Sequence, residues 1–368
     1  MPRVDTSLPA LAAGGSRIPR TVEAYLTTNL ETLTEVDGGL LPHEQEALQA
    51  LHGEVLRRHA PPGCSSIDTE LLRGGMRGGQ MVEVCGESAS GKTQLCLAAA
   101  AQAARSSQRV VYVDTSNALS GRRLAQVVAA QHQAAAEQAG GAGAAAPQAA
   151  AGPLKFVEVR RCYNVHSLLR VLDELMLQAE QQAQAQRQPG PQQQPGAAQQ
   201  QPGAAQQPGA LQQAPSSVPS AVARRRRLEE LPVGLLVVDC LSALITPILG
   251  GGQHSQGHAL LAATAASLKA FAARSGAAVL VTAHMVGGSD ERRHEKRPAM
   301  GESWRNQPHV RIQLSRPAED RTSGQCSATL TASPQLPAGL SVAYWLGEGG
   351  PTGTPPQAGG QQAQPMQH

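Results

Sequence analysis

Hydrophobic positions in the middle of the chain alternate between two patterns. Short continuous apolar runs predict buried strands, and these runs are QMVEVCG, RVVYVDT, LKFVEV, VGLLVVDC and AAVLVTAH, which begin at residues 80, 109, 154, 233 and 277. Segments with apolar residues three or four positions apart lie between them and predict amphipathic helices at about 92–105, 120–133, 164–181 and 257–276. The alternation indicates an α/β fold with a mainly parallel sheet that is covered by helices on both faces.

The two ends of the chain follow other patterns. HVRIQLS, QCSATLTAS and LSVAYWL, which begin at residues 309, 325 and 340, predict three strands without intervening helices, as in antiparallel additions at a sheet edge. Residues 20–60 carry apolar residues at helical spacing on either side of a Gly-Gly break and predict a small helical domain. We therefore expect a flexible N-terminus at 1–19, this helical domain, an α/β core at 61–348 and a disordered tail at 349–368.

Two low-complexity inserts interrupt the predicted core. Residues 135–153 are almost all Ala, Gly and Gln, and residues 181–227 repeat a QQPGAA unit before ending in four arginines. With so few apolar residues, neither insert can offset the entropy cost of ordering, so we expect both to be flexible. The four arginines allow two interpretations, a patch for nuclear import or phosphate binding and a plain solvated end of a linker.

Charge, cysteine spacing and hydropathy argue against several classes of protein. The net charge of +3 is too small to indicate nucleic-acid binding unless basic residues cluster locally. The six cysteines lie far apart without metal-ligand spacing, so we expect reduced and buried thiols. No run reaches the roughly 18 uncharged apolar residues of a membrane span, and the start of the chain lacks a signal-peptide pattern, so we expect a soluble intracellular protein.

The motif GESASGKT fits the phosphate-binding loop G-x4-G-K-[ST] and lies between a predicted strand and a predicted helix. Its glycines let the backbone wrap closely around phosphates, Lys92 can reach the outer phosphates, and the Thr93 hydroxyl can ligate Mg²⁺. Asp239 ends a buried strand at the edge where a parallel sheet binds ligands, and we expect it to organise the metal together with Thr93. The sequence thus predicts a site for ATP and Mg²⁺. The predicted nucleotide-binding residues are Gly86, Glu87, Ser88, Ala89, Ser90, Gly91, Lys92 and Thr93.

Longer stretches around these motifs resemble the RecA-like recombinase family. They include CSSIDTELLRGGMRGGQMVEVCGESASGKTQLC, LLVVDCLSAL and RPAMGESWRNQPHVRIQL. SALITPILGGGQ, KRPAMGESW and the helical start TVEAYLTTNLETL look most like the D-type paralogues of the eukaryotic recombinase. The resemblance implies a RecA-like ATPase core and a nuclear protein of homologous recombination repair, which binds single-stranded DNA and assists the main strand-exchange recombinase.

The resemblance also implies partners, namely other recombinase paralogues that dock on the helical domain and on the core of a hetero-oligomer. An alternative interpretation is a non-catalytic scaffold subunit whose ATP is structural. A third is a different RecA-like ATPase, such as a helicase or a clock-type protein, but neither accounts for the helical start together with PAMGESW.

Site roles follow from matching motifs. The resemblance makes Lys92, Asp239 and His284 the catalytic set, with His284 as the sensor of the terminal phosphate; the alternative for His284 is a satisfied histidine at a strand end. Two loops of the family face DNA, and here they are TPILGGGQHSQGH and MVGGSDERRHEKRPAMGESWRNQ. Basic side chains can neutralise phosphates and an aromatic ring can stack on a base, although a solvated charge run beside a structural tryptophan remains an alternative. The predicted DNA-binding residues are Arg292, Arg293, Lys296, Arg297, Trp304 and Arg305.

Two departures from the family pattern limit the expected activity. Ser116 takes the place of a glutamate that polarises the attacking water, and a hydroxyl is too weak a base to replace it. We therefore expect a weak DNA-dependent ATPase, unless Asp114 or an acid of ERRHE substitutes. The family also assembles through a Phe-x-x-Ala element, but RRHAPPGCSSID contains no phenylalanine, so self-assembly into long filaments by that route is not expected.

Overall fold

The computed structural model describes residues 59–60, 63–138, 152–187, 221–249, 254–287, 297–317 and 323–355. All five predicted central strands are present, as β3 (Met81–Gly86), β4 (Arg109–Asp114), β5 (Val157–Arg161), β6 (Val233–Asp239) and β7 (Ala278–Val286). The four predicted helices between them are α4 (Lys92–Arg105), α5 (Gly121–Gln138), α7 (Val165–Arg187) and α10 (His254–Ser275).

Ten of the described strands form one large sheet in the order β12-β11-β10-β9-β3-β7-β6-β4-β5, with β8 (Arg297–Pro298) paired to β7 and β12 (Gly350–Thr352) at one edge. β3 pairs in parallel with β7 on one side and with β9 (Val310–Ser315) on the other. β10 (Gln325–Ala332) and β11 (Ser341–Gly347) continue the sheet in antiparallel order, as predicted for the segment without helices. The prediction is wrong for β9, the first strand of that segment, because it pairs in parallel with β3. The α/β fold class is therefore confirmed.

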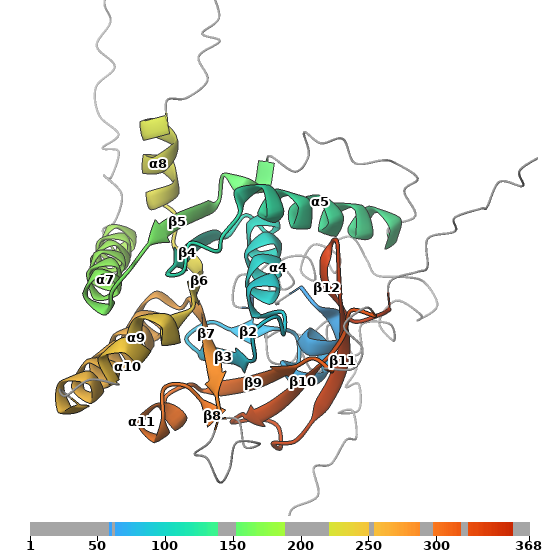
Figure 1. Cartoon of the computed structure of the whole chain (residues 1–368). Coiled ribbons are helices and arrows are strands. Elements are labelled where there is room, and N and C mark those ends of the chain that lie inside the picture. Colours follow the sequence, from blue (N-terminus) through green and yellow to red (C-terminus); the bar gives the residue numbers. More distant parts are fainter. Residues whose placement is uncertain are drawn as a thin grey trace, which may run out of the picture.

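Helices cover the parallel part of the sheet on both faces (Figure 1). Successive side chains of a strand point to opposite faces, so Val82 and Val84 pack in the core beneath α4 and α5. Met81 and Cys85 pack on the other face, in the core that contains α7, α10 and a further helix, α9 (Leu241–Leu249). The phosphate loop begins at the carboxyl end of β3 and leads into α4.

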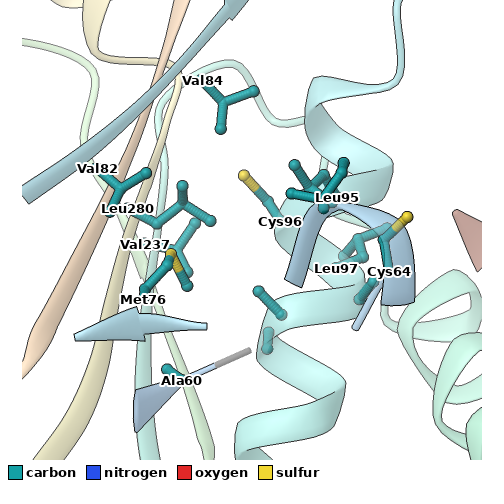
Figure 2. Packing of buried hydrophobic residues seen from close by; sticks show 14 of the residues in the cluster. Ala60, Cys64, Met76, Val82, Val84, Leu95, Cys96, Leu97, Val237 and Leu280 are labelled. Carbon is teal, nitrogen blue, oxygen red and sulfur yellow. The ribbon is translucent and has the colours of Figure 1, made fainter. Parts of the chain in front are cut away.

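The core is aliphatic and rich in alanine. Figure 2 shows Leu95 and Cys96 of α4 facing Val84, Val237 and Leu280 of the sheet. The alanines of α4 have small side chains. Because protein interiors are close-packed, this helix lies close to the strands. All six cysteines are free and buried, as the sequence predicted.

Several element limits differ from the predictions. α7 continues to Arg187 and α8 (Ala221–Glu229) covers the arginines, so both ends of the second insert are helical, because Gln, Ala and Arg have good helix propensity. α5 likewise extends to Gln138, into the first insert. The predicted tail from 349 is wrong at its start, because β12 (Gly350–Thr352) pairs with β11 through backbone hydrogen bonds that need no apolar pattern.

The first predicted DNA-facing loop, TPILGGGQHSQGH at 246–258, is helical at both ends. α9 continues through Pro247 to Leu249, and α10 begins at His254. The apolar run of α9 is short, and such a run does not by itself distinguish helix from loop or strand.

Other predictions fall on residues that the structure does not describe. The helical domain at 20–60 lies outside the described residues, except that its last two form β1 (His59–Ala60), a strand paired with β2 (Met76–Arg77). The predicted N-terminus at 1–19 and residues 356–368 also lie outside. Among the described helices, none is both long and apolar enough to cross a membrane.

Candidate functional site

The phosphate loop joins the end of β3 to the start of α4. Two of its glycines are required by the geometry: a Cβ on Gly86 would lie 2.6 Å from the Leu314 carbonyl oxygen, and Gly91 has a φ of 96°. Ala89 also adopts a positive φ, of 63°. This backbone carries the chain directly into α4 at Lys92, so the helix N-terminus, with its unpaired amide groups, lies at the loop.

Lys92 is folded back over the loop. Its Nζ donates to the carbonyl oxygens of Gly86 at 2.8 Å and of Glu87 at 2.6 Å, and the residue is 7% exposed. Burial lowers the pKa of the Lys92 ammonium, while nearby Cys240 and Asp239 oppose this shift. A buried ammonium beside a helix N-terminus is a strong site for anions such as phosphate.

Asp239 is held from both sides at the end of β6. Its Oδ1 accepts a hydrogen bond from Thr282 Oγ1 at 2.6 Å, and its Oδ2 accepts one from Tyr112 OH at 3.0 Å. Both donors come from neighbouring strands, β7 and β4. Neither residue was predicted as part of the site, although a polar side chain in an otherwise apolar strand, as in VLVTAH, is a signal that could have indicated Thr282.

One cavity of about 470 Å³ brings the predicted nucleotide site together. Its volume lies within the range of small-molecule sites. Thr93 and Asp239 supply a hydroxyl and a carboxylate, which are donors that suit Mg²⁺ when phosphate oxygens complete its shell. No cluster of three or more metal-binding His, Cys, Asp or Glu side chains occurs in the described part of the chain. The cavity is lined by Ser88, Ala89, Gly91, Lys92, Thr93, Gln94, Ser116, Ala118, Asp239, Cys240, His284, Arg316 and Leu346.

His284 lies at this cavity, at the carboxyl end of β7. Its backbone N–H donates to Ser242 Oγ at 2.9 Å, and its imidazole is hydrogen-bonded to the Cys240 side chain, which raises the pKa of His284. Burial alone would raise the pKa of the Cys240 thiol, but hydrogen bonds from His284 and Ser242 leave it lowered. The imidazole therefore has a fixed partner beside the phosphate loop.

Asp114 is the only acidic alternative to the missing glutamate among the described residues. Ser116 lines the cavity, as its place in the motif predicted. Asp114 is turned toward the backbone, where its Oδ1 accepts from the amides of Ser116 and Ala118 and its Oδ2 from that of Leu119, each at 3.2 Å. Asp114 therefore serves a tight turn and does not fit the role of a substitute base. The acids of ERRHE, residues 291–295, lie outside the described residues.

The predicted DNA-binding residues are only partly described. Arg292, Arg293 and Lys296 lie outside the described residues, and Arg297 belongs to the short strand β8 (Arg297–Pro298). Arg305 is exposed in α11 (Glu302–Arg305), where its Nη1 lies 3.4 Å from Glu302 Oε2. The end of the predicted second loop is thus folded into β8 and α11.

Trp304 contradicts its predicted role. The residue is 0% exposed, and its indole Nε1 donates to Glu83 Oε1 at 2.9 Å. Arg311 Nε forms an ion pair with the other oxygen of Glu83, and Arg311 Nη2 donates to the Trp304 carbonyl at 3.4 Å. A tryptophan buried in this way cannot stack on a base, so the structural alternative is the correct one. Burial raises the pKa of Glu83, and Arg311 opposes that shift.

The chain is similar to known proteins of DNA repair and recombination. A family model described as the RecA N-terminal domain matches residues 50–133. The chain is 30% identical over 303 residues to DNA repair protein RAD51 homolog 4 of Mus musculus, in an alignment that covers 82% of this chain and 74% of that protein. The protein of the same name from Bos taurus is 30% identical over 295 residues, with 80% and 72% covered. DNA repair and recombination protein RadB of Halobacterium salinarum is 40% identical over 73 residues, which are 20% of this chain and 30% of that protein.

Proposed function

The chain belongs to the RecA-like recombinase family, among the DNA repair proteins related to RAD51 homolog 4, and we propose that it binds ATP with Mg²⁺ and contacts single-stranded DNA in the ATP-bound state. It is a RecA-like protein of DNA repair and recombination. In the proposal, it assists the main strand-exchange recombinase in the nucleus, within a hetero-oligomer of related paralogues.

One observation carries the nucleotide proposal: Asp239, which is far from Lys92 and Thr93 in sequence, lines the same cavity as they do at the start of α4. Lys92 would leave its carbonyl partners and bind the outer phosphates, while the helix N-terminus would receive them. Thr93 and Asp239 would hold Mg²⁺, which, when bound, neutralises charge on the phosphates. Thr282 and Tyr112 would keep the Asp239 carboxylate in place.

The DNA proposal rests on how β7 continues. His284 lies at the cavity, and the next two residues of the strand pair with β8, Met285 opposite Pro298 and Val286 opposite Arg297. The segment between these paired strands carries Arg292, Arg293 and Lys296. A phosphate contact at His284 would therefore act on the base of a loop that bears basic residues. Arg297 and Arg305 would add to the contact, whereas Trp304 is not part of it.

We expect slow turnover of ATP because the cavity presents Ser116 where a base is needed. Replacing Ser116 with glutamate is expected to increase the steady-state rate of ATP hydrolysis by about 10²-fold, since a positioned general base typically contributes about 10²- to 10⁴-fold. Release of phosphate in the presence of single-stranded DNA measures the effect. Ser116→Gln is the matched control, because it has the same size without a base. Equal rates for both variants would contradict this account of slow turnover.

A second function remains supported by the same residue. Ser116 also suits a scaffold subunit that keeps its ATP as a structural ligand and leaves DNA to its partners. Under that alternative, Ser116→Glu would gain turnover, but single-stranded DNA would not stimulate it. DNA dependence therefore separates the two functions.

A further inference from the structure

Four consecutive arginines, Arg224–Arg227, lie on α8, a helix that the proposed function does not use. The sequence left open whether this run is a phosphate-binding patch or the solvated end of a linker. The structure places it on a helix of nine residues that stands out from the body of the core above β5 and β6 (Figure 1). The arginines are thus presented on a formed element of the fold.

The carboxyl end of α8 is anchored to the core by two side chains. Arg109 Nη1 donates to the carbonyl oxygens of Glu229 and Leu231, both at 3.3 Å. Gln182 Nε2 donates to the same two oxygens, at 2.9 Å and 3.3 Å. These donors satisfy carbonyl groups that a helix end leaves unpaired, and the cation also suits the negative end of the helix dipole.

The anchor itself is buried. Arg109 is 1% exposed, and its Nη2 binds Glu158 Oε2 at 2.8 Å and Gln178 Oε1 at 3.1 Å. Because burying an unpaired charge is costly, this paired guanidinium is held in one place. It therefore fixes the position of α8 against β4 and α7.

The positive charge of α8 is neutralised only in part by the described residues. Arg225 pairs with Glu229 at 2.8 Å, whereas Arg226 and Arg227 are exposed and form no ion pair with any described residue. The preceding segment, residues 188–223, contains no aspartate or glutamate. Arg226 and Arg227 are therefore available to bind an anion, and a guanidinium matches the oxygens of a phosphate group well.

α8 also lies at the end of the sheet opposite the nucleotide cavity. It leads into the first residues of β6, while Asp239 at the cavity is the last residue of that strand. A seven-residue strand is about 23 Å long at about 3.3 Å per residue. A contact on α8 is therefore separated from the ATP site by about the length of strand β6.

We infer that α8 is a second DNA-binding surface, which holds the phosphate backbone through Arg226 and Arg227 whether or not ATP is bound. The side chains that carry it are cationic and no described aromatic residue accompanies them on α8, so the contact neutralises phosphates and does not read bases. The inference takes DNA as the polyanion from the proposed function, but it uses different residues and predicts a different dependence on ATP.

The test is fluorescence anisotropy of a labelled single-stranded oligonucleotide over a series of salt concentrations, with the full-length chain, with ATP and Mg²⁺ and without nucleotide. In Arg226→Gln/Arg227→Gln, the slope of log affinity against log salt concentration is expected to decrease in magnitude by about 1.4. This is the effect of losing two phosphate contacts at about 0.7 each. The change should be the same with and without ATP. Arg73→Gln/Arg122→Gln, which removes two exposed arginines elsewhere, should leave the slope unchanged.

The outcomes separate this inference from the proposed function. If ATP does not change DNA affinity in the unaltered protein but the α8 variant still lowers the slope, the proposed coupling fails and the α8 surface stands. An unchanged slope in the α8 variant overturns the inference. Loss of nuclear accumulation by that variant, with DNA binding intact, would likewise overturn it and assign the arginines to an import receptor.

Discussion

Replacing Lys92 with alanine is expected to weaken ATP binding by about 10- to 150-fold, which corresponds to about 1.5–3 kcal/mol for hydrogen bonds to a charged group. The reason is that Nζ is the buried cation at the phosphate loop, and the structure offers no neighbouring lysine along the cavity wall. Titration of a fluorescent ATP analogue in the presence of Mg²⁺ measures the change.

The control is Lys269→Ala, because Lys269 Nζ bonds to Gln307 Oε1 at 3.0 Å and does not line the cavity. This variant should bind ATP as tightly as the unaltered protein. If Lys92→Ala bound ATP with unchanged affinity while remaining folded, the assignment of the cavity to the phosphates of ATP would be wrong.

Replacing Arg311 with leucine is expected to lower the free energy of unfolding by about 3–5 kcal/mol at neutral pH, the usual cost of breaking a buried ion pair from one side. Glu83 is 0% exposed, and without Arg311 its charge would be left with only the indole N–H of Trp304. Urea unfolding followed by circular dichroism measures the loss. Tryptophan emission provides a second signal, because Trp304 is part of the cluster.

The same variant should become sensitive to pH. Without its cation, buried Glu83 would have a pKa in the folded state above that of about 4.3 in the unfolded chain. The folded state then binds the proton more tightly, so stability is greatest at low pH and falls as the pH rises above about 4.3. Glu83→Gln/Arg311→Leu should recover much of the loss and this pH dependence, because Gln is uncharged and its oxygen can still accept from Trp304. If Arg311→Leu alone were as stable as the unaltered protein at neutral pH, the ion pair would not have the stabilising role given to it here.

The central part of the fold could be predicted because each strand there is a continuous apolar run and each helix has apolar residues three or four positions apart. β6 and α4 match their predicted limits closely, since an apolar run and a glycine loop mark where they begin and end. The limits of α7 and α8 could not be predicted in the same way. Their glutamines and arginines favour helix locally, whereas the composition of the whole insert favours disorder.

The candidate site was predicted to a similar extent. The phosphate-loop motif has a fixed spacing, and the strand that ends in Asp239 reaches the same edge of the sheet. Lys92, Thr93 and Asp239 could therefore be placed near one another from the sequence. The role of Trp304 depends on a partner, Glu83, that lies 221 residues away in sequence. No local pattern records such a contact, and a basic loop around an aromatic residue looks the same whether the ring is buried or exposed.

The central claim is that nucleotide at the phosphate loop controls contact with single-stranded DNA. The most direct measurement is fluorescence anisotropy of a labelled single-stranded oligonucleotide titrated with the full-length chain in ATP and Mg²⁺, in ADP and Mg²⁺, and without nucleotide. The account predicts the tightest binding with ATP, weakened by added salt, because basic residues beyond β7 neutralise phosphates. The same affinity in all three nucleotide states, or no binding in any of them, would contradict it.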